Sequence, residues 1–152
     1  MTLAFRNLKA RPDDPVERWP LEAIQTALER GSLEQWRRLA AAIAAEPWGP
    51  VARRVEEVLR YSRPYGVSEA MERALTGTRE RAEAAERHEV AAAVAELVRE
   101  SGLSRSEFAS RIGTSASRLS TYETGRVTPS AALLVRMQRV AEGAQVPPEN
   151  ET

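Results

Sequence analysis

The chain has 152 residues with 22 basic and 22 acidic side chains, 42% hydrophobic and 5% aromatic residues, and no cysteine. This length provides for one compact domain or two small ones, and the alanine-rich, aromatic-poor composition favours helix over sheet. The absence of cysteine excludes a disulfide framework, a thiolate zinc site and a cysteine nucleophile. The formal net charge of zero argues against a protein that coats polyanions in general, although it leaves room for a local basic face.

No apolar run approaches the roughly 20 residues that span a bilayer. The first residues, MTLAFRNLKARPDD, lack the apolar centre of a signal peptide. We therefore expect a soluble, cytoplasmic protein without a membrane partner.

The N-terminal half predicts an arm followed by short helices. Three prolines prevent a continuous helix before Leu21, so residues 1–20 are expected to form an extended arm. The first helix is expected to end at Gly31 in the left-handed conformation, and a fourth helix to end at residues 76–78. Apolar residues at helical spacing predict a shared core: Leu21, Ile24, Leu28, Leu33, Trp36, Leu39, Ala40, Ile43, Val51, Val55, Val58, Leu59, Met71, Ala74 and Leu75. Core packing is also favoured over an aromatic pocket for the tryptophans Trp19, Trp36 and Trp48.

Residues 79–89, RERAEAAERHE, are charged nearly all round and predict a solvated helix that links two packed units. The same composition is compatible with an interhelical dimer contact. His88 lies in this run without a second histidine at ligand spacing, so no metal or general-base role is assigned to it.

The C-terminal half carries a more specific pattern. Ser104 and Glu107 form a capping box before a short helix that closes at Gly113, and Thr114 or Ser115 can cap the next helix. Two short helices joined by a glycine-containing turn describe a helix-turn-helix. Inward-facing residues are predicted along this half: Val90, Val94, Leu97, Val98, Phe108, Ala109, Ile112, Leu119, Tyr122, Leu133, Leu134, Met137, Val140 and Ala141.

The order of LSRSEFA, IG, SASRLS, YETG and then PS before a leucine pair resembles the Xre/Cro family of phage-repressor-type domains, over residues 90–143. The resemblance implies binding to double-stranded DNA, usually as a homodimer on a pseudo-palindromic operator, with the second helix of the motif in the major groove. It assigns base contacts to Ser115, Ala116, Ser117, Arg118 and Thr121. It assigns contacts with the DNA backbone to Ser104, Arg105, Thr124, Arg126 and Thr128.

Two positions refine this assignment. Ala116 stands where many family members have Gln, Arg or Lys, so specificity is expected to depend on few contacts or on DNA shape. Glu123 is expected to close the end of its helix rather than contact a base.

We therefore predict an all-α protein in which an N-terminal bundle of short helices is joined by a charged helix to a C-terminal lambda-repressor-like helix-turn-helix domain. The predicted segments are an extended arm (1–20), a partner or dimerisation domain (21–78), a linker helix (79–89), a DNA-binding domain (90–143) and a disordered tail (144–152).

The leading interpretation is a transcriptional repressor, of which an autoregulating antitoxin with a toxin bound at its N-terminal domain is one form. The alternative is a protein-interaction adaptor without specific DNA binding, which Ala116 and the zero net charge favour. The sequence contains no glycine-rich phosphate loop, HExxH, GxSxG or DxDxDG element, so we assign no catalytic residue, no metal and no cofactor.

Overall fold

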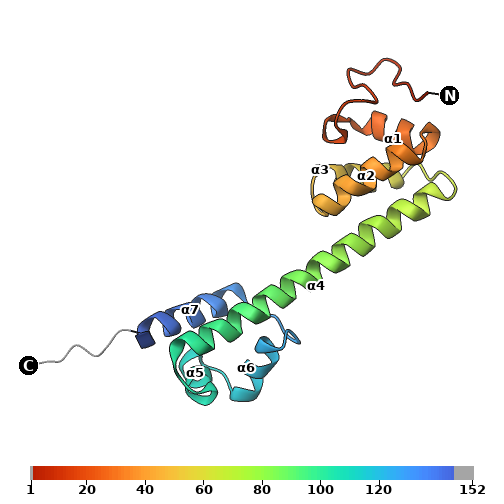
Figure 1. Ribbon diagram of the computed structural model, residues 1–152. Coiled ribbons are helices and arrows are strands. Elements are labelled where there is room, and N and C mark those ends of the chain that lie inside the picture. Colours follow the sequence, from red (N-terminus) through yellow and green to blue (C-terminus); the bar gives the residue numbers. More distant parts are fainter. Residues whose placement is uncertain (1, 146–152) are drawn as a thin grey trace, which may run out of the picture. The chain divides into compact units, whose positions relative to one another are not determined.

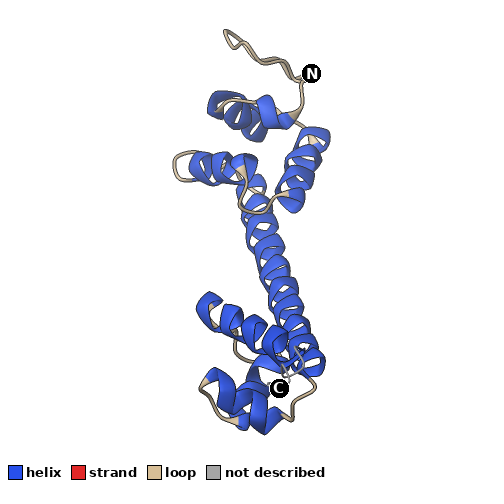
Figure 2. Ribbon diagram, turned by 90° about the vertical axis from the view of Figure 1, so that its left-hand side faces the viewer, coloured by secondary structure: helices blue, strands red, loops and turns tan. Residues whose placement is uncertain are grey.

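The computed structural model describes residues 2–145, and all regular secondary structure in that range is helical (Figures 1 and 2). The all-α fold class is thereby confirmed. The chain divides into two compact units, Met1–Ala82 and Glu83–Thr152. The helices are η1 Val16–Arg18, α1 Leu21–Arg30, α2 Leu33–Ala45, α3 Pro50–Leu59, α4 Val67–Ser101, α5 Arg105–Ile112, α6 Ala116–Glu123 and α7 Ala131–Gln145. None of them is long and apolar enough to cross a membrane.

The first unit packs α1, α2, α3 and the beginning of α4 around one core. The apolar stripes of these helices meet there, and the largest fully buried side chains are Trp19, Ile24, Leu28, Leu39, Ile43, Val55 and Val58. Leu33 departs from the prediction, because it is 55% exposed at the start of α2. Of the tryptophans, Trp19 is fully buried and Trp36 half-buried, whereas core packing is the wrong prediction for Trp48, which is 45% exposed.

The residues before α1 are attached to this core by side chains from other helices. The Phe5 ring packs edge-on against Trp19, with 5.2 Å between the ring centroids. Arg38 of α2 donates hydrogen bonds to the carbonyls of Pro12 and Asp14, at 2.6 and 2.5 Å. Because these carbonyls belong to no regular helix, the guanidinium supplies the donors that secondary structure would otherwise provide.

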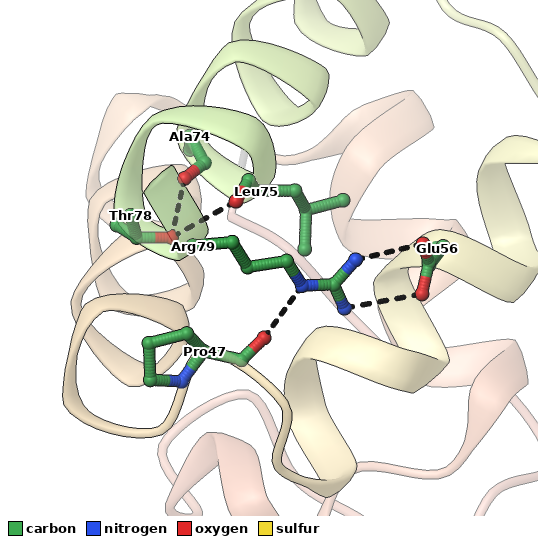
Figure 3. A network of polar contacts seen from close by, with 6 residues as sticks. All are labelled: Pro47, Glu56, Ala74, Leu75, Thr78 and Arg79. Carbon is green, nitrogen blue, oxygen red and sulfur yellow. Dashed lines mark hydrogen bonds and ion pairs between the residues drawn. The ribbon is translucent and has the colours of Figure 1, made fainter. Parts of the chain in front are cut away.

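The helix expected to end at residues 76–78 continues instead, so that α4 is a single helix of 35 residues. The hydroxyl of Thr78 donates to the carbonyl of Ala74 at 2.6 Å, within the helix itself. Arg79, one residue later, donates to the carbonyl of Pro47 at 2.9 Å and to both carboxylate oxygens of Glu56 at 2.9 and 3.2 Å (Figure 3). A single glycine costs a helix about 1 kcal/mol, which these contacts offset.

Gly31 also differs from the prediction. Its φ is −76° and its ψ is −177°, so α1 ends in extended rather than left-handed backbone. The chain passes directly to Ser32, whose N–H donates to the side-chain oxygen of Gln35 at 2.7 Å and so begins α2.

The second unit packs the later part of α4 with α5, α6 and α7. Its core contains Val94, Val98, Phe108, Ala109, Ile112, Leu119, Tyr122 and Met137. The other predicted inward positions, Val90, Leu97, Leu133, Leu134 and Val140, are partly buried against it, and Ala141 is buried. Of the predicted tail, residues 144–152, the part from Val146 onward lies outside the described residues, and α7 continues to Gln145.

Candidate nucleic-acid interface

Helices α5 and α6 are joined by a turn whose conformation the sequence sets residue by residue. The hydroxyl of Ser104 accepts from the N–H of Glu107, and the carboxylate of Glu107 accepts from the N–H of Ser104, both at 3.2 Å, which confirms the capping box. Gly113 ends α5 at φ +82°, a left-handed conformation that glycine adopts without steric cost. Ser115 then caps α6, its hydroxyl accepting from the N–H of Arg118 at 3.1 Å.

The outer face of α6 presents small side chains. Leu119 and Tyr122 point into the core, and at about 100° per residue the positions opposite them face away from the unit. Those positions are Ser117 and Ser120, which are exposed, and Thr121, which is half-buried; the exposed Ala116 flanks them at the start of the helix. Backbone and short side chains are therefore accessible along this face.

Arg118 is the long cationic side chain of α6, and it lies along the edge of this face. Its Nε donates to the hydroxyl of Tyr122 at 3.2 Å, and its guanidinium lies 5.7 Å from the centre of the Tyr122 ring. Residues four apart on a helix are neighbours, so Tyr122 holds the arginine on the side of α6 that adjoins the core.

Two threonine hydroxyls toward the end of α6 already donate to the helix backbone. Thr121 donates to the carbonyl of Arg118 at 2.6 Å, and Thr124 donates to the carbonyl of Ser120 at 3.0 Å. Each hydroxyl has one proton and two lone pairs, so in this arrangement Thr121 and Thr124 offer acceptors to a ligand.

An ion pair joins the start of α5 to the end of α6. The Nε of Arg105 lies 3.0 Å from a carboxylate oxygen of Glu123, whose side chain is largely buried, whereas that of Arg105 is largely exposed. The pair brings Arg105 beside the end of α6, where Thr124 follows. Glu123 is thus engaged within the protein, but it pairs with α5 and does not close the end of its own helix as the sequence predicted.

Charge within the second unit is distributed unevenly. Residues 105–145 carry six arginines and three glutamates, whereas residues 83–101 carry two arginines and five glutamates. Two of the three glutamates are engaged, Glu107 in the capping box and Glu123 with Arg105. Arg111 and Arg126 are exposed and make no hydrogen bond or ion pair within the described part of the chain. The segment that forms α5, α6 and α7 therefore carries a net positive charge, whereas this part of α4 carries a net negative charge.

A comparison with protein families matches residues 78–150 to a family described as a helix-turn-helix domain. The C-terminal half of this chain is a helix-turn-helix domain. No curated protein and no solved structure matches the chain significantly. The helix-turn-helix domain suggests a DNA-binding regulator rather than an enzyme. Among the described residues, no group of three or more histidine, aspartate or glutamate side chains is placed to hold a metal ion.

The helix-turn-helix domain exposes most of the residues selected from the sequence. Of the predicted base-contacting set, Ser115, Ala116, Ser117 and Arg118 are exposed and Thr121 is half-buried. The predicted backbone-contacting set, Ser104, Arg105, Thr124, Arg126 and Thr128, is exposed throughout. These residues lie at the start of α5, along α6 and in the connection from α6 to α7.

Sequence reasoning missed one contact of the helix-turn-helix domain. Arg136 of α7 donates to the carbonyl of Ile112 at 2.9 Å and so satisfies the end of α5. The two residues are 24 positions apart in the chain, so this contact leaves no local signal in the sequence.

Proposed function

We propose that the protein is a sequence-specific transcriptional regulator that inserts α6 into the major groove of double-stranded DNA. The observation that supports this most strongly is the exposed outer face of α6, within a domain of helix-turn-helix type. The major groove is about 12 Å wide and admits one α-helix, and side chains as short as Ala116 and Ser117 allow the backbone of that helix to approach the base edges closely.

The predicted base contacts follow from the chemistry of each side chain. Ser115 and Ser117 carry hydroxyls 3.1 Å apart at the start of α6, which can read donors or acceptors on the bases. Ala116 suits a thymine methyl group. Thr121 offers a methyl group and an acceptor, since its proton is bound to a helix carbonyl. Arg118 reaches guanine or phosphate once it leaves the Tyr122 ring.

The proposed phosphate contacts border this helix on two sides. Ser104 and Arg105 are at the start of α5, and Thr124, Arg126 and Thr128 follow α6. Phosphate contacts of this kind fix the register of a recognition helix on the duplex without reading its sequence.

The finer form of the proposal is a repressor that binds a pseudo-palindromic operator as a homodimer and blocks promoter access. A single short recognition helix buries little surface, so two copies on adjacent half-sites supply the affinity that one lacks. The first unit has a core of its own and is available for a protein partner. In one form of this proposal the protein is an autoregulating antitoxin. Its helix-turn-helix domain represses its own operon, and its first unit binds a toxin.

The test is fluorescence anisotropy with the DNA upstream of the protein's own gene and a shuffled duplex, over a range of salt concentrations. We expect a preference of about a hundredfold or more for the native DNA, retained as salt weakens nonspecific binding. The double substitution Arg118→Ala and Thr121→Ala should reduce this preference, whereas Arg53→Ala, at an exposed site on α3, should leave it unchanged. Unchanged affinity in the double variant would contradict the assignment of α6 and favour the adaptor function.

A further inference from the structure

An open apolar groove of about 460 Å³ lies in the first unit between α2 and the beginning of α4. Each helix lines it with residues on one face: Leu33, Trp36 and Ala40 on α2, and Val67, Ala70 and Ala74 on α4. The spacing of i, i+3 or i+4, and i+7 on both sides means that the groove follows the two helices for about two turns. Alanines line both of its sides, Ala40 on α2 and Ala70 and Ala74 on α4.

Large apolar groups remain exposed where this groove opens. Leu33 is 55% exposed and Tyr65 is 98% exposed, although Leu33 belongs by its spacing to the apolar stripe of α2. Trp36 has its polar edge satisfied, because its Nε1 donates to the carbonyl of Ala27 at 2.8 Å. An indole whose polar edge is satisfied, beside exposed leucine and tyrosine, is typical of residues that anchor protein interfaces.

One charged side chain lines the groove, that of Arg37. It is exposed and has no hydrogen-bond or ion-pair partner among residues 2–145. Three other arginines of this unit, Arg38, Arg54 and Arg79, are bound to carbonyls or to a carboxylate. Arg37 is therefore a cation available to a ligand beside an apolar surface.

We propose that this groove binds an acidic amphipathic helix of a partner protein. A helix laid between α2 and α4 places apolar side chains at i and i+4 over the alanines, and a neighbouring carboxylate meets Arg37. A second copy meeting the groove with its own groove brings two Arg37 side chains together, and no carboxylate is among the residues that line the groove. This inference gives the chemistry of the protein partner in the proposed function, and it does not depend on DNA binding.

The experiment is a selection of displayed helical peptides of about three turns, with all outward positions randomised, on the full-length protein. We expect enrichment of apolar residues at i and i+4 together with Asp or Glu. Selected peptides, labelled and measured by anisotropy, should bind Ala70→Arg and Arg37→Glu at least about tenfold more weakly than the unsubstituted protein. The control Arg53→Glu makes the same charge change at an exposed site on α3, outside the groove, and should bind normally.

Circular dichroism verifies that each variant is folded, and operator binding is measured with the same preparations. The proposal is overturned if no peptides are enriched or if the selected peptides bind all variants equally. It is also overturned if sedimentation detects a dimer that Ala70→Arg dissociates, because the groove would then bind a second copy. Peptide binding without operator binding would contradict the proposed function alone.

Discussion

The two units are both helical, yet their helices are held in place by contacts of different range. In the second unit, the polar contacts that begin α5 and α6 join residues three apart, such as Ser104 with Glu107 and Ser115 with Arg118. In the first unit, Arg38 and Arg54 bind backbone carbonyls between 24 and 37 residues away. A local contact leaves a motif in the sequence, whereas a distant contact requires the fold before it can form.

Among the substitutions that test this difference, replacing Trp19 should have the largest effect on the free energy of unfolding. Its fully buried side chain contacts Phe5 and Arg38, and its Nε1 donates to the carbonyl of Arg11 at 3.1 Å. We expect Trp19→Ala to lower the free energy of unfolding of the first unit by about 3–5 kcal/mol. Chemical denaturation followed by circular dichroism measures this.

The matched control for this prediction is Trp48→Ala, since Trp48 is 45% exposed in a turn. It should cost less than about 1 kcal/mol. Equal losses in the two variants would mean that the segment before α1 contributes little to the first unit.

Substituting two glycines tests how much the backbone conformation at each position contributes to the stability of the protein. Gly113→Ala forces an alanine to φ +82° at the end of α5, and we expect a loss of about 1–2 kcal/mol. Gly77→Ala lies within α4, where the added methyl meets only the flexible end of Arg81 at 3.3 Å. Helix propensity predicts a gain of about 0.5–1 kcal/mol there.

Thermal denaturation of the two glycine variants measures both effects. If Gly77→Ala destabilises the protein as much as Gly113→Ala, the contact with Arg81 outweighs helix propensity. The continuity of α4 would then depend on that glycine.

The smallest predicted effect concerns the ion pair of Glu56 with Arg79. The hydrogen bond from Arg79 holds the pKa of Glu56 below its ordinary value of 4.5. The carboxylate therefore contributes stability above that ordinary value, and the contribution is lost as the pH falls through the lowered pKa of the folded state. Because the Glu56 side chain is partly exposed and solvent screens the pair, Glu56→Gln should cost less than about 1 kcal/mol at pH 7.

Urea denaturation of the protein and of Glu56→Gln at pH 7 and at pH 3 checks this sign. The two proteins should differ at pH 7, and the difference should decrease toward pH 3. A difference that increases toward acid pH would show that the carboxylate does not stabilise the folded state through its charge.

The range of the contacts also explains which expectations failed. Leu33 satisfies the helical spacing of a core residue but lies beyond the surface that α1 and α3 cover, so spacing alone misplaces it. The Thr76–Thr78 segment reads as a helix end, yet Thr78 bonds within the helix and Arg79 binds α3 and the turn before it. A sequence pattern indicates which residues favour burial, but it does not indicate whether another segment packs against them.

The sequence by itself determined the all-helical class, the capping box at Ser104, the glycine turn at Gly113 and the inward positions of α5 and α6. These features depend on backbone φ angles, on hydrogen bonds between residues three apart and on helical periodicity. All three act within one or two turns of a helix. Only the tertiary structure decided that α4 is continuous, that Arg105 meets Glu123 and that a groove remains open beside Arg37. Each of these depends on the packing of segments that are distant in the chain, which local chemistry does not fix.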